Sequence, residues 1–268
     1  MATGNVFALL AEEIAQAKAS IVVLSAESLS FIRHPETLRQ ALAPHPARIV
    51  IYLRRQDSYL ASLYNQLVKS RLFTATFDEF LRQHPENAID YDRLLKLWAS
   101  AFGRENILAG VFEDYALPTG ILNDIAAKAG IDITGLQPPA ADTNPALLHS
   151  IVALKRRVNA LLSSEDERVC CERLFTANNI SAEKAPTDED ISNNVARRRS
   201  MLAGYQEGNA RVAKEYFAGR PKLFEDPGER DSLLPDYGET DWQEARHQAA
   251  VRMIAGLVAE LAKKEDVQ

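Results

Sequence analysis

Short runs of β-branched and aliphatic residues alternate with amphipathic stretches along the first half of the chain. Three of these runs predict parallel strands that are buried on both faces: IVVLSAE at 21–27, RIVIYL at 48–53 and NILAGVFED at 106–114. Between the runs, apolar residues recur every three or four positions, which predicts helices. Strands that alternate with helices in this way indicate an α/β fold with right-handed crossovers.

The clearest alternation lies between residues 48 and 71, where a strand, a charged turn and a helix follow one another directly. Asp57 stands where it can cap this helix. The predicted buried side of the helix consists of Leu60, Leu63, Tyr64, Leu67 and Val68. Farther along, Asp90 and Gly103 predict the two ends of a longer helix over 91–102.

The pattern changes at 131–146, IDITGLQPPAADTNPA, which is rich in proline and polar residues. Beyond this segment the pattern predicts helices and no strand, with helical spacing over 144–162, 165–177, 188–218 and from Trp242 to about Lys263. We therefore predict an α/β core at 1–130, a linker at 131–146, and a helical extension packed on the core at 147–268.

Composition places the 268-residue chain among ordinary globular proteins, with 46% hydrophobic and 25% charged residues. Its formal net charge of -6 argues against a general nucleic-acid binder, which needs a basic surface. No apolar run approaches the length of a membrane span, and the first residues lack the pattern of a secretory signal. Cys170 and Cys171 are adjacent and form no disulfide framework, so we expect a reducing, cytoplasmic setting.

Candidate binding residues follow from the rule that parallel sheets bind ligands at the carboxyl ends of their strands. Arg54 follows the predicted strand at 48–53, and Ser62 lies eight positions later, in the first turns of the helix. A guanidinium, a hydroxyl and the positive end of a helix can together bind an anion. The alternatives are a surface ion pair for Arg54 and a solvent-exposed helix position for Ser62.

Glu27 ends the predicted strand at 21–27 and would share the sheet edge of Arg54 if the two strands run parallel. A carboxylate there could be the general base that takes a proton from an acceptor hydroxyl. A helix-capping or substrate-positioning role is the alternative. Two basic clusters, 155–157 and 197–199, are expected on the solvent-exposed sides of helices, with contact to an acidic glycan as the alternative.

The order of Arg54, Ser62 and Tyr64 within LRRQDSYLASLYNQ resembles the segment with which sulfotransferases hold the 3′-phosphate of 3′-phosphoadenosine 5′-phosphosulfate. Further segments are similar to bacterial sulfotransferases that modify carbohydrates: TFDEFL at 76–81, DYDRLLKLWASAFGRENILAGVFE at 90–113 and YQEGNARVAKEYF at 205–217. The resemblance covers most of residues 4–225. It implies a P-loop-type parallel sheet, the phosphosulfate as co-substrate, no metal, and a hydroxyl or amine acceptor on a carbohydrate or small molecule. It also implies that Arg54 and Ser62 hold the 3′-phosphate.

The resemblance is incomplete near the N-terminus. Sulfotransferases bind the phosphosulfate with a Gly-Thr-rich loop between their first strand and first helix, and this sequence contains no such loop. The chain thus resembles a family member that starts one βα unit late, and we expect an incomplete sheet with unpaired strand edges. Two hypotheses follow: an enzyme whose first unit is missing through a misassigned start or removal, or a complete, non-catalytic relative that binds a partner or forms a homo-oligomer. A P-loop kinase is a third hypothesis, but no Walker loop is present.

Overall fold

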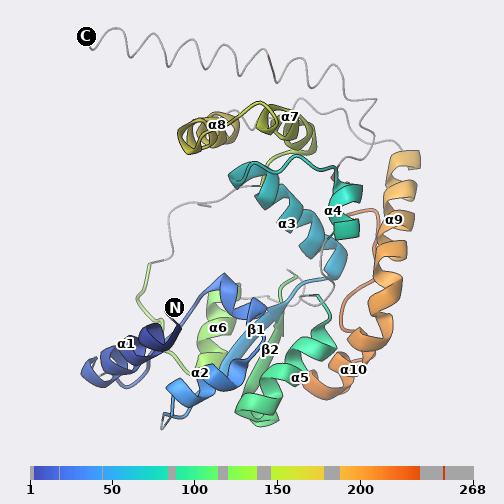
Figure 1. Cartoon of the computed structure of the whole chain (residues 1–268). Coiled ribbons are helices and arrows are strands. Elements are labelled where there is room, and N and C mark those ends of the chain that lie inside the picture. The colour runs from blue at the N-terminus through green and yellow to red at the C-terminus, as the bar shows by residue number, and fades with distance from the viewer. Residues whose placement is uncertain are drawn as a thin grey trace, which may run out of the picture. The chain divides into compact units, whose positions relative to one another are not determined.

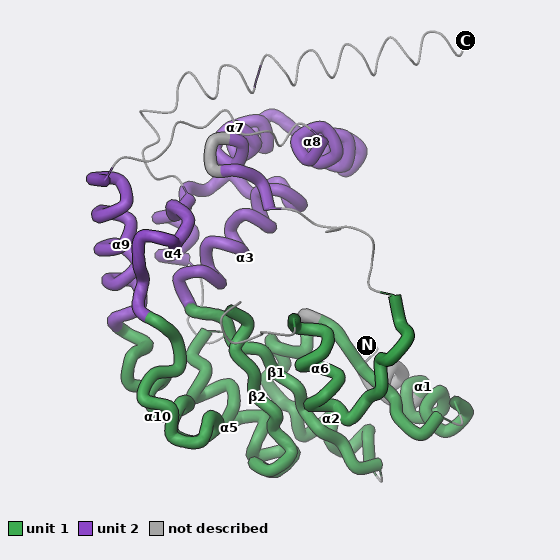
Figure 2. Tube along the Cα trace, turned by 180° about the vertical axis from the view of Figure 1, so that it is seen from behind, with its two compact units in different colours: residues 1–55, 85–137, 204–225 green, residues 56–84, 138–203, 226–268 purple. Residues whose placement is uncertain are grey.

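The computed structural model describes residues 3–17, 19–43, 45–83, 89–113, 120–137, 146–177, 188–235 and 250 (Figure 1). The chain forms two compact units that use its segments in alternation (Figure 2). Unit 1 consists of Met1–Arg55, Pro85–Gln137 and Gly204–Glu225, and unit 2 consists of Gln56–His84, Pro138–Ala203 and Asp226–Gln268.

The sheet of unit 1 contains two parallel strands in the described part of the chain. They are β1 at Ile49–Leu53 and β2 at Ile107–Val111. The strands pair from the first residue of each to the last, so Leu53 lies opposite Val111 and both strands end at the same edge. The α/β class and the positions of two of the three predicted strands are thereby confirmed. Their predicted burial on both faces is wrong for β1, which is half-buried at every residue except Leu53.

The third predicted strand, at 21–27, is wrong. Residues 21–26 have no regular structure, and Glu27–Phe31 forms the 3₁₀-helix η1. The four apolar side chains of the run are between 40% and 63% exposed: Ile21, Val22, Val23 and Leu24. Their composition favours extended backbone, but a strand forms only where a neighbour supplies the ladder of hydrogen bonds. No described segment pairs with residues 21–26.

Tyr52 of β1 explains why β2 carries a glycine at position 110. The Tyr52 ring lies across Gly110, and a Cβ at that position would be only 2.5 Å from the ring. The Tyr52 hydroxyl donates a hydrogen bond to Asp124 of α6 (Ile121–Ala129), and Asp124 also accepts one from Lys128 at 2.7 Å. These contacts connect the sheet to α6.

Helix α5 (Tyr91–Phe102) is at the centre of the apolar core of unit 1. It contacts both strands, α2 (Pro35–Ala41) and α10 (Gln206–Tyr216). The most deeply buried of these core side chains are Leu53, Leu95, Trp98, Ile107, Val111, Val212, Ala213 and Leu223. Unit 1 also contains α1 (Thr3–Gln16) and the 3₁₀-helix η3 (Arg104–Asn106).

Both predicted ends of α5 are confirmed. The Asp90 carboxylate accepts a hydrogen bond from the backbone N–H of Arg93 at 3.1 Å. Gly103 follows the helix with a φ of 87°, a conformation that favours glycine. The helix predicted over 188–218 is instead divided, because α9 (Asp188–Leu202) ends before the 3₁₀-helix η5 (Ala203–Tyr205), which separates it from α10.

Unit 2 is a cluster of helices around α3 (Gln56–Ser70). Helix α3 contacts α4 (Phe77–Gln83), α7 (His149–Asn159), α8 (Glu165–Ala177) and α9 (Asp188–Leu202). Its predicted inner side is confirmed, since Leu60, Tyr64 and Val68 are buried and Leu63 and Leu67 are half-buried. The ring of Tyr64 packs with the rings of Phe73, Phe77 and Phe80, and its hydroxyl donates to the carbonyl of Ala75 at 3.0 Å.

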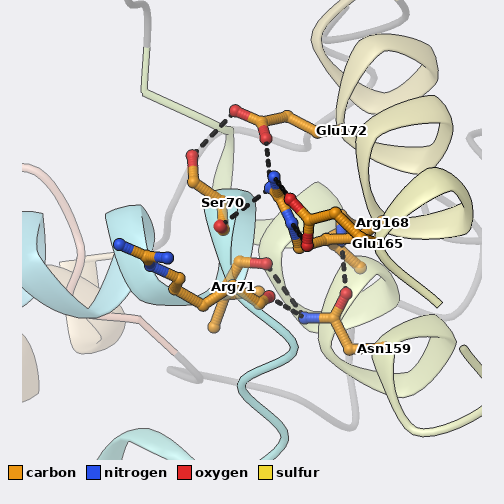
Figure 3. A network of polar contacts seen from close by, with 8 residues as sticks. Ser70, Arg71, Asn159, Glu165, Arg168 and Glu172 are labelled. Atoms are coloured by element: carbon orange, nitrogen blue, oxygen red, sulfur yellow. Dashed lines mark hydrogen bonds and ion pairs between the residues drawn. The ribbon is translucent and has the colours of Figure 1, made fainter. Parts of the chain in front are cut away.

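A polar network secures the C-terminal end of α3 (Figure 3). The Asn159 amide donates to the carbonyls of Val68, Arg71 and Phe73 at 2.9, 3.2 and 2.9 Å, respectively. Arg168 of α8 donates to the carbonyl of Ser70 at 2.9 Å. The carbonyls of Val68 and Ser70 belong to the last turn of α3, where a helix leaves carbonyls without intrahelical partners, and those of Arg71 and Phe73 follow the helix.

The two basic clusters were expected on solvent-exposed helix sides, and one member of each contradicts this expectation. Lys155 is fully buried, and its ammonium group donates to Asn159 and lies 5.7 Å from the centroid of the Phe175 ring. Arg198 is 1% exposed and forms an ion pair with Asp57, which is itself completely buried. Asp57 therefore does not stand before the helix as a cap, but lies inside the first turn of α3.

Some predictions concern residues outside the described part of the chain. These are the helix from Trp242 to about Lys263 and the middle of the predicted linker at 138–145. The helix predicted from Asn144 starts later than expected, because residues 146–148 are not helical and α7 begins at His149. The backbone N–H and carbonyl of Leu147 bond the side chain of Asn65 and not a helical turn. Among the described residues, no helix is long and apolar enough to cross a membrane.

Candidate functional site

The candidate site is the carboxyl edge of the sheet in unit 1, which we define as Arg54 and Arg55 after β1 together with Phe112 and Glu113 after β2. The parallel pairing places these two segments side by side. The backbone N–H of Phe112 donates to the carbonyl of Leu53 at 2.8 Å, which extends the strand ladder by one bond. Arg54 thus follows the strand as predicted, at the edge where parallel sheets bind ligands.

Hydrogen bonds within this edge and to other parts of unit 1 hold Arg54 and Arg55 in place. The Tyr91 hydroxyl donates to the carbonyl of Arg54 at 2.6 Å. The backbone N–H of Arg55 donates to Oε1 of Glu113 at 2.6 Å, and Nη1 of Arg55 donates to the carbonyl of Glu225 at 3.4 Å. Arg55 is buried by these contacts, whereas Arg54 is half-buried.

The Arg54 guanidinium packs against an aromatic ring. Its Cζ atom lies 5.5 Å from the centroid of the Phe112 ring, which is within the range of a cation–π contact. Phe112 itself is 40% exposed. Within the described ranges, no carboxylate or carbonyl accepts a hydrogen bond from Arg54, so the alternative of a surface ion pair is not seen there.

Glu113 brings a carboxylate to the same edge. Its Oε2 atom is buried and has no hydrogen-bond partner among the residues that the structure describes. Burial raises the pKa of the Glu113 carboxyl above its ordinary value. The Arg55 and Glu113 backbone N–H groups and the charges of Arg55 and Arg54 act in the opposite direction and lower this pKa, but burial is the larger effect.

The other two predicted site residues are placed differently. Ser62 lies on α3, is exposed, and belongs to unit 2, whereas Arg54 belongs to unit 1. The joint binding of an anion by the two residues therefore stays a prediction. Glu27 does not end a strand, because it is the first residue of η1, and its side chain lies outside the described part. Its role as a general base also stays a prediction.

Sequence reasoning missed Tyr91, Phe112 and Glu113 as parts of this edge. The signal for the latter two was present, because they close the predicted strand at 106–114, and the rule that singled out Arg54 applies to that strand as well. Tyr91 offered no such signal, since it stands at the start of a helix. The described residues contain no cluster of His, Cys, Asp and Glu that could hold a metal ion.

No protein-family model matches the chain, and no solved structure is significantly similar to it. A curated protein of Archaeoglobus fulgidus is similar to it and is described only as an uncharacterized protein. The two are 27% identical over 201 residues, which are 73% of this chain and 54% of the relative. The chain therefore spans about half the length of this relative.

Proposed function

We propose that the carboxyl edge of the sheet binds the 3′-phosphate of 3′-phosphoadenosine 5′-phosphosulfate. We further propose that the protein is sulfotransferase-like and transfers the sulfo group to a hydroxyl or amine of a carbohydrate. One observation carries the proposal. The Arg54 guanidinium stands at the carboxyl end of a parallel strand, rests on an aromatic ring and has no acceptor among the described residues. A guanidinium in this position offers paired donors to a phosphate.

In the proposed reaction, the acceptor oxygen or nitrogen forms a bond to sulfur while the bond between sulfur and the phosphate oxygen breaks. Glu27 takes the proton of the acceptor, and 3′-phosphoadenosine 5′-phosphate leaves. Arg54 and Ser62 bind the 3′-phosphate, away from the reacting atoms, and thereby orient the donor. The sheet in this proposal is of the P-loop type. Because the sequence contains no Gly-Thr-rich loop for the leaving phosphate, binding is the property to test first.

The test is a calorimetric titration of the full chain with 3′-phosphoadenosine 5′-phosphate. Arg54→Ala is expected to weaken binding at least about tenfold, because it removes charge-assisted hydrogen bonds to the phosphate. Arg104→Ala is the matched control, since Arg104 also packs on an aromatic ring, that of Tyr216, but precedes β2 at the opposite end of the strand. Its affinity is expected to equal that of the wild type. Equal affinities for wild type and Arg54→Ala would contradict the proposal.

A non-catalytic relative that associates with itself or a partner is the second candidate. The exposed apolar run from Ile21 to Leu24 favours it, because a contiguous apolar surface is typical of an interaction site. This candidate predicts no affinity for the nucleotide at millimolar concentration in the same titration. The titration therefore distinguishes the two functions, because a transferase binds the nucleotide and a non-catalytic relative does not.

A further inference from the structure

Glu113 connects the ends of the two strands at the proposed anion site. Its Oε1 atom accepts the backbone N–H of Arg55, the residue that directly follows Arg54. Its neighbour Phe112 supplies the ring on which the Arg54 guanidinium rests. The two consecutive residues after β2 thus contact the backbone and the side chain of the corner after β1.

Burying the Glu113 carboxylate at this corner costs folding free energy. The Glu113 carboxylate is half-buried, and its Oε2 atom has no hydrogen-bond partner in the described part of the chain. Burial costs the carboxylate part of its hydration. The hydrogen bonds to Oε1 and the charges of the two nearby arginines offset this cost in part. Groups buried at such a cost gather at functional sites.

We propose that Glu113 is a positioning residue of the anion site, whose carboxylate fixes the Arg54–Arg55 corner and thereby the direction of the Arg54 guanidinium. The proposal builds on the proposed function for the identity of the anion. The restraint on Arg54 is a property of the protein without ligand. It can therefore be measured whether or not the nucleotide binds.

The first measurement is the mobility of the Arg54 side chain by NMR relaxation of its Nε–H group in the ligand-free full chain, with Arg54→Lys to assign the signal. Glu113→Ala is expected to raise this mobility clearly, because the Arg55 N–H loses its acceptor. Glu113→Gln retains an oxygen acceptor and is expected to restore most of the order. Backbone signals of β1 and β2 in the same samples show whether each variant is folded.

Glu105→Ala is the control, because Glu105 is an exposed glutamate in η3, at the amino end of β2. It is expected to leave the mobility of Arg54 unchanged. Equal mobility of Arg54 in the wild type and in folded Glu113→Ala would overturn the inference. Equally high mobility in Glu113→Gln and Glu113→Ala would also overturn it, because the effect would then come from charge and not from the hydrogen bond.

Titration with 3′-phosphoadenosine 5′-phosphate separates this inference from the proposed function. If the wild type binds the nucleotide through Arg54, Glu113→Ala is expected to weaken binding about tenfold and Glu113→Gln to recover most of that loss. Full affinity in folded Glu113→Ala would overturn the inference while the proposed function stands. If the wild type binds no nucleotide, the proposed function fails, and the mobility of Arg54 still decides the role of Glu113.

Discussion

At the scale of single residues, the ion pair between Asp57 and Arg198 is a polar contact buried inside unit 2. Asp57 is completely buried and Arg198 is 1% exposed, and their closest atoms are 2.5 Å apart. Arg198 also donates to the carbonyl of Ser232, which connects α9 to the segment that follows residue 226. Removing either charge breaks a buried ion pair and leaves the opposite charge buried, which is strongly destabilising.

We therefore predict that Arg198→Ala lowers the free energy of unfolding by about 3–5 kcal/mol, measured by urea denaturation. The neighbouring Arg197 is the control. It forms an ion pair with Asp78, whose side chain is 67% exposed, so Arg197→Ala is expected to cost no more than about 1 kcal/mol. A loss for Arg198→Ala as small as that for Arg197→Ala would show that the pair does not hold α3 and α9 together.

At the scale of elements, the C-terminal end of α3 is hydrogen-bonded by a side chain from another helix. Asn159 lies on α7, yet its amide bonds three carbonyls at and beyond the end of α3, and its Oδ1 atom accepts from Lys155. Burial lowers the pKa of the Lys155 ammonium, and interactions with Cys171 and Glu172 raise it, so this charged group depends on its partners. Asn159 is thus the hydrogen-bond partner of both the end of α3 and the buried Lys155.

Asn159→Ala is expected to destabilise the protein by about 3 kcal/mol or more, since each buried polar group left unpaired costs about 1–3 kcal/mol. Asn193→Ala, an exposed position on α9, is the matched control and is expected to change stability by less than about 0.5 kcal/mol. Hydrogen exchange of the last turn of α3 locates the effect. Unchanged protection of that turn in Asn159→Ala would contradict the assignment.

The same elements show what the sequence could and could not predict. The strands at 49–53 and 107–111, the inner side of α3 and both ends of α5 follow from local composition and spacing, and the structure confirms them. The run at 21–24 has equally strong strand composition but lacks a partner strand in the described part, and pairing is not a local property. Likewise, nothing near Arg198 in the sequence indicates its burial, because Asp57 lies 141 positions away.

At the scale of the whole molecule, the two units divide the chain by proximity in space and not by its order. The core of unit 1 includes α10, whose Val212 and Ala213 are fully buried in the cluster that contains α5. The boundaries predicted at 130 and 146 assume a contiguous core, and they stay predictions. The predicted contiguous core and the observed unit 1 lead to different expectations for the folding of a fragment that ends before α10.

A fragment of residues 1–130 is expected not to unfold cooperatively, because it lacks the helix that covers one side of α5. The same fragment joined through a flexible linker to residues 204–225 is expected to regain a cooperative transition, measured by circular dichroism on heating. Cooperative unfolding of residues 1–130 alone would instead support the contiguous core.

The central claim is that Arg54 at the carboxyl edge of the sheet binds a nucleotide phosphate. A crystal structure of the full chain with 3′-phosphoadenosine 5′-phosphate tests it most directly. We expect phosphate oxygens about 2.7–2.9 Å from the nitrogens of the Arg54 guanidinium. Nucleotide bound elsewhere, or an Arg54 side chain still resting on Phe112 with no phosphate beside it at saturating ligand, would contradict the claim.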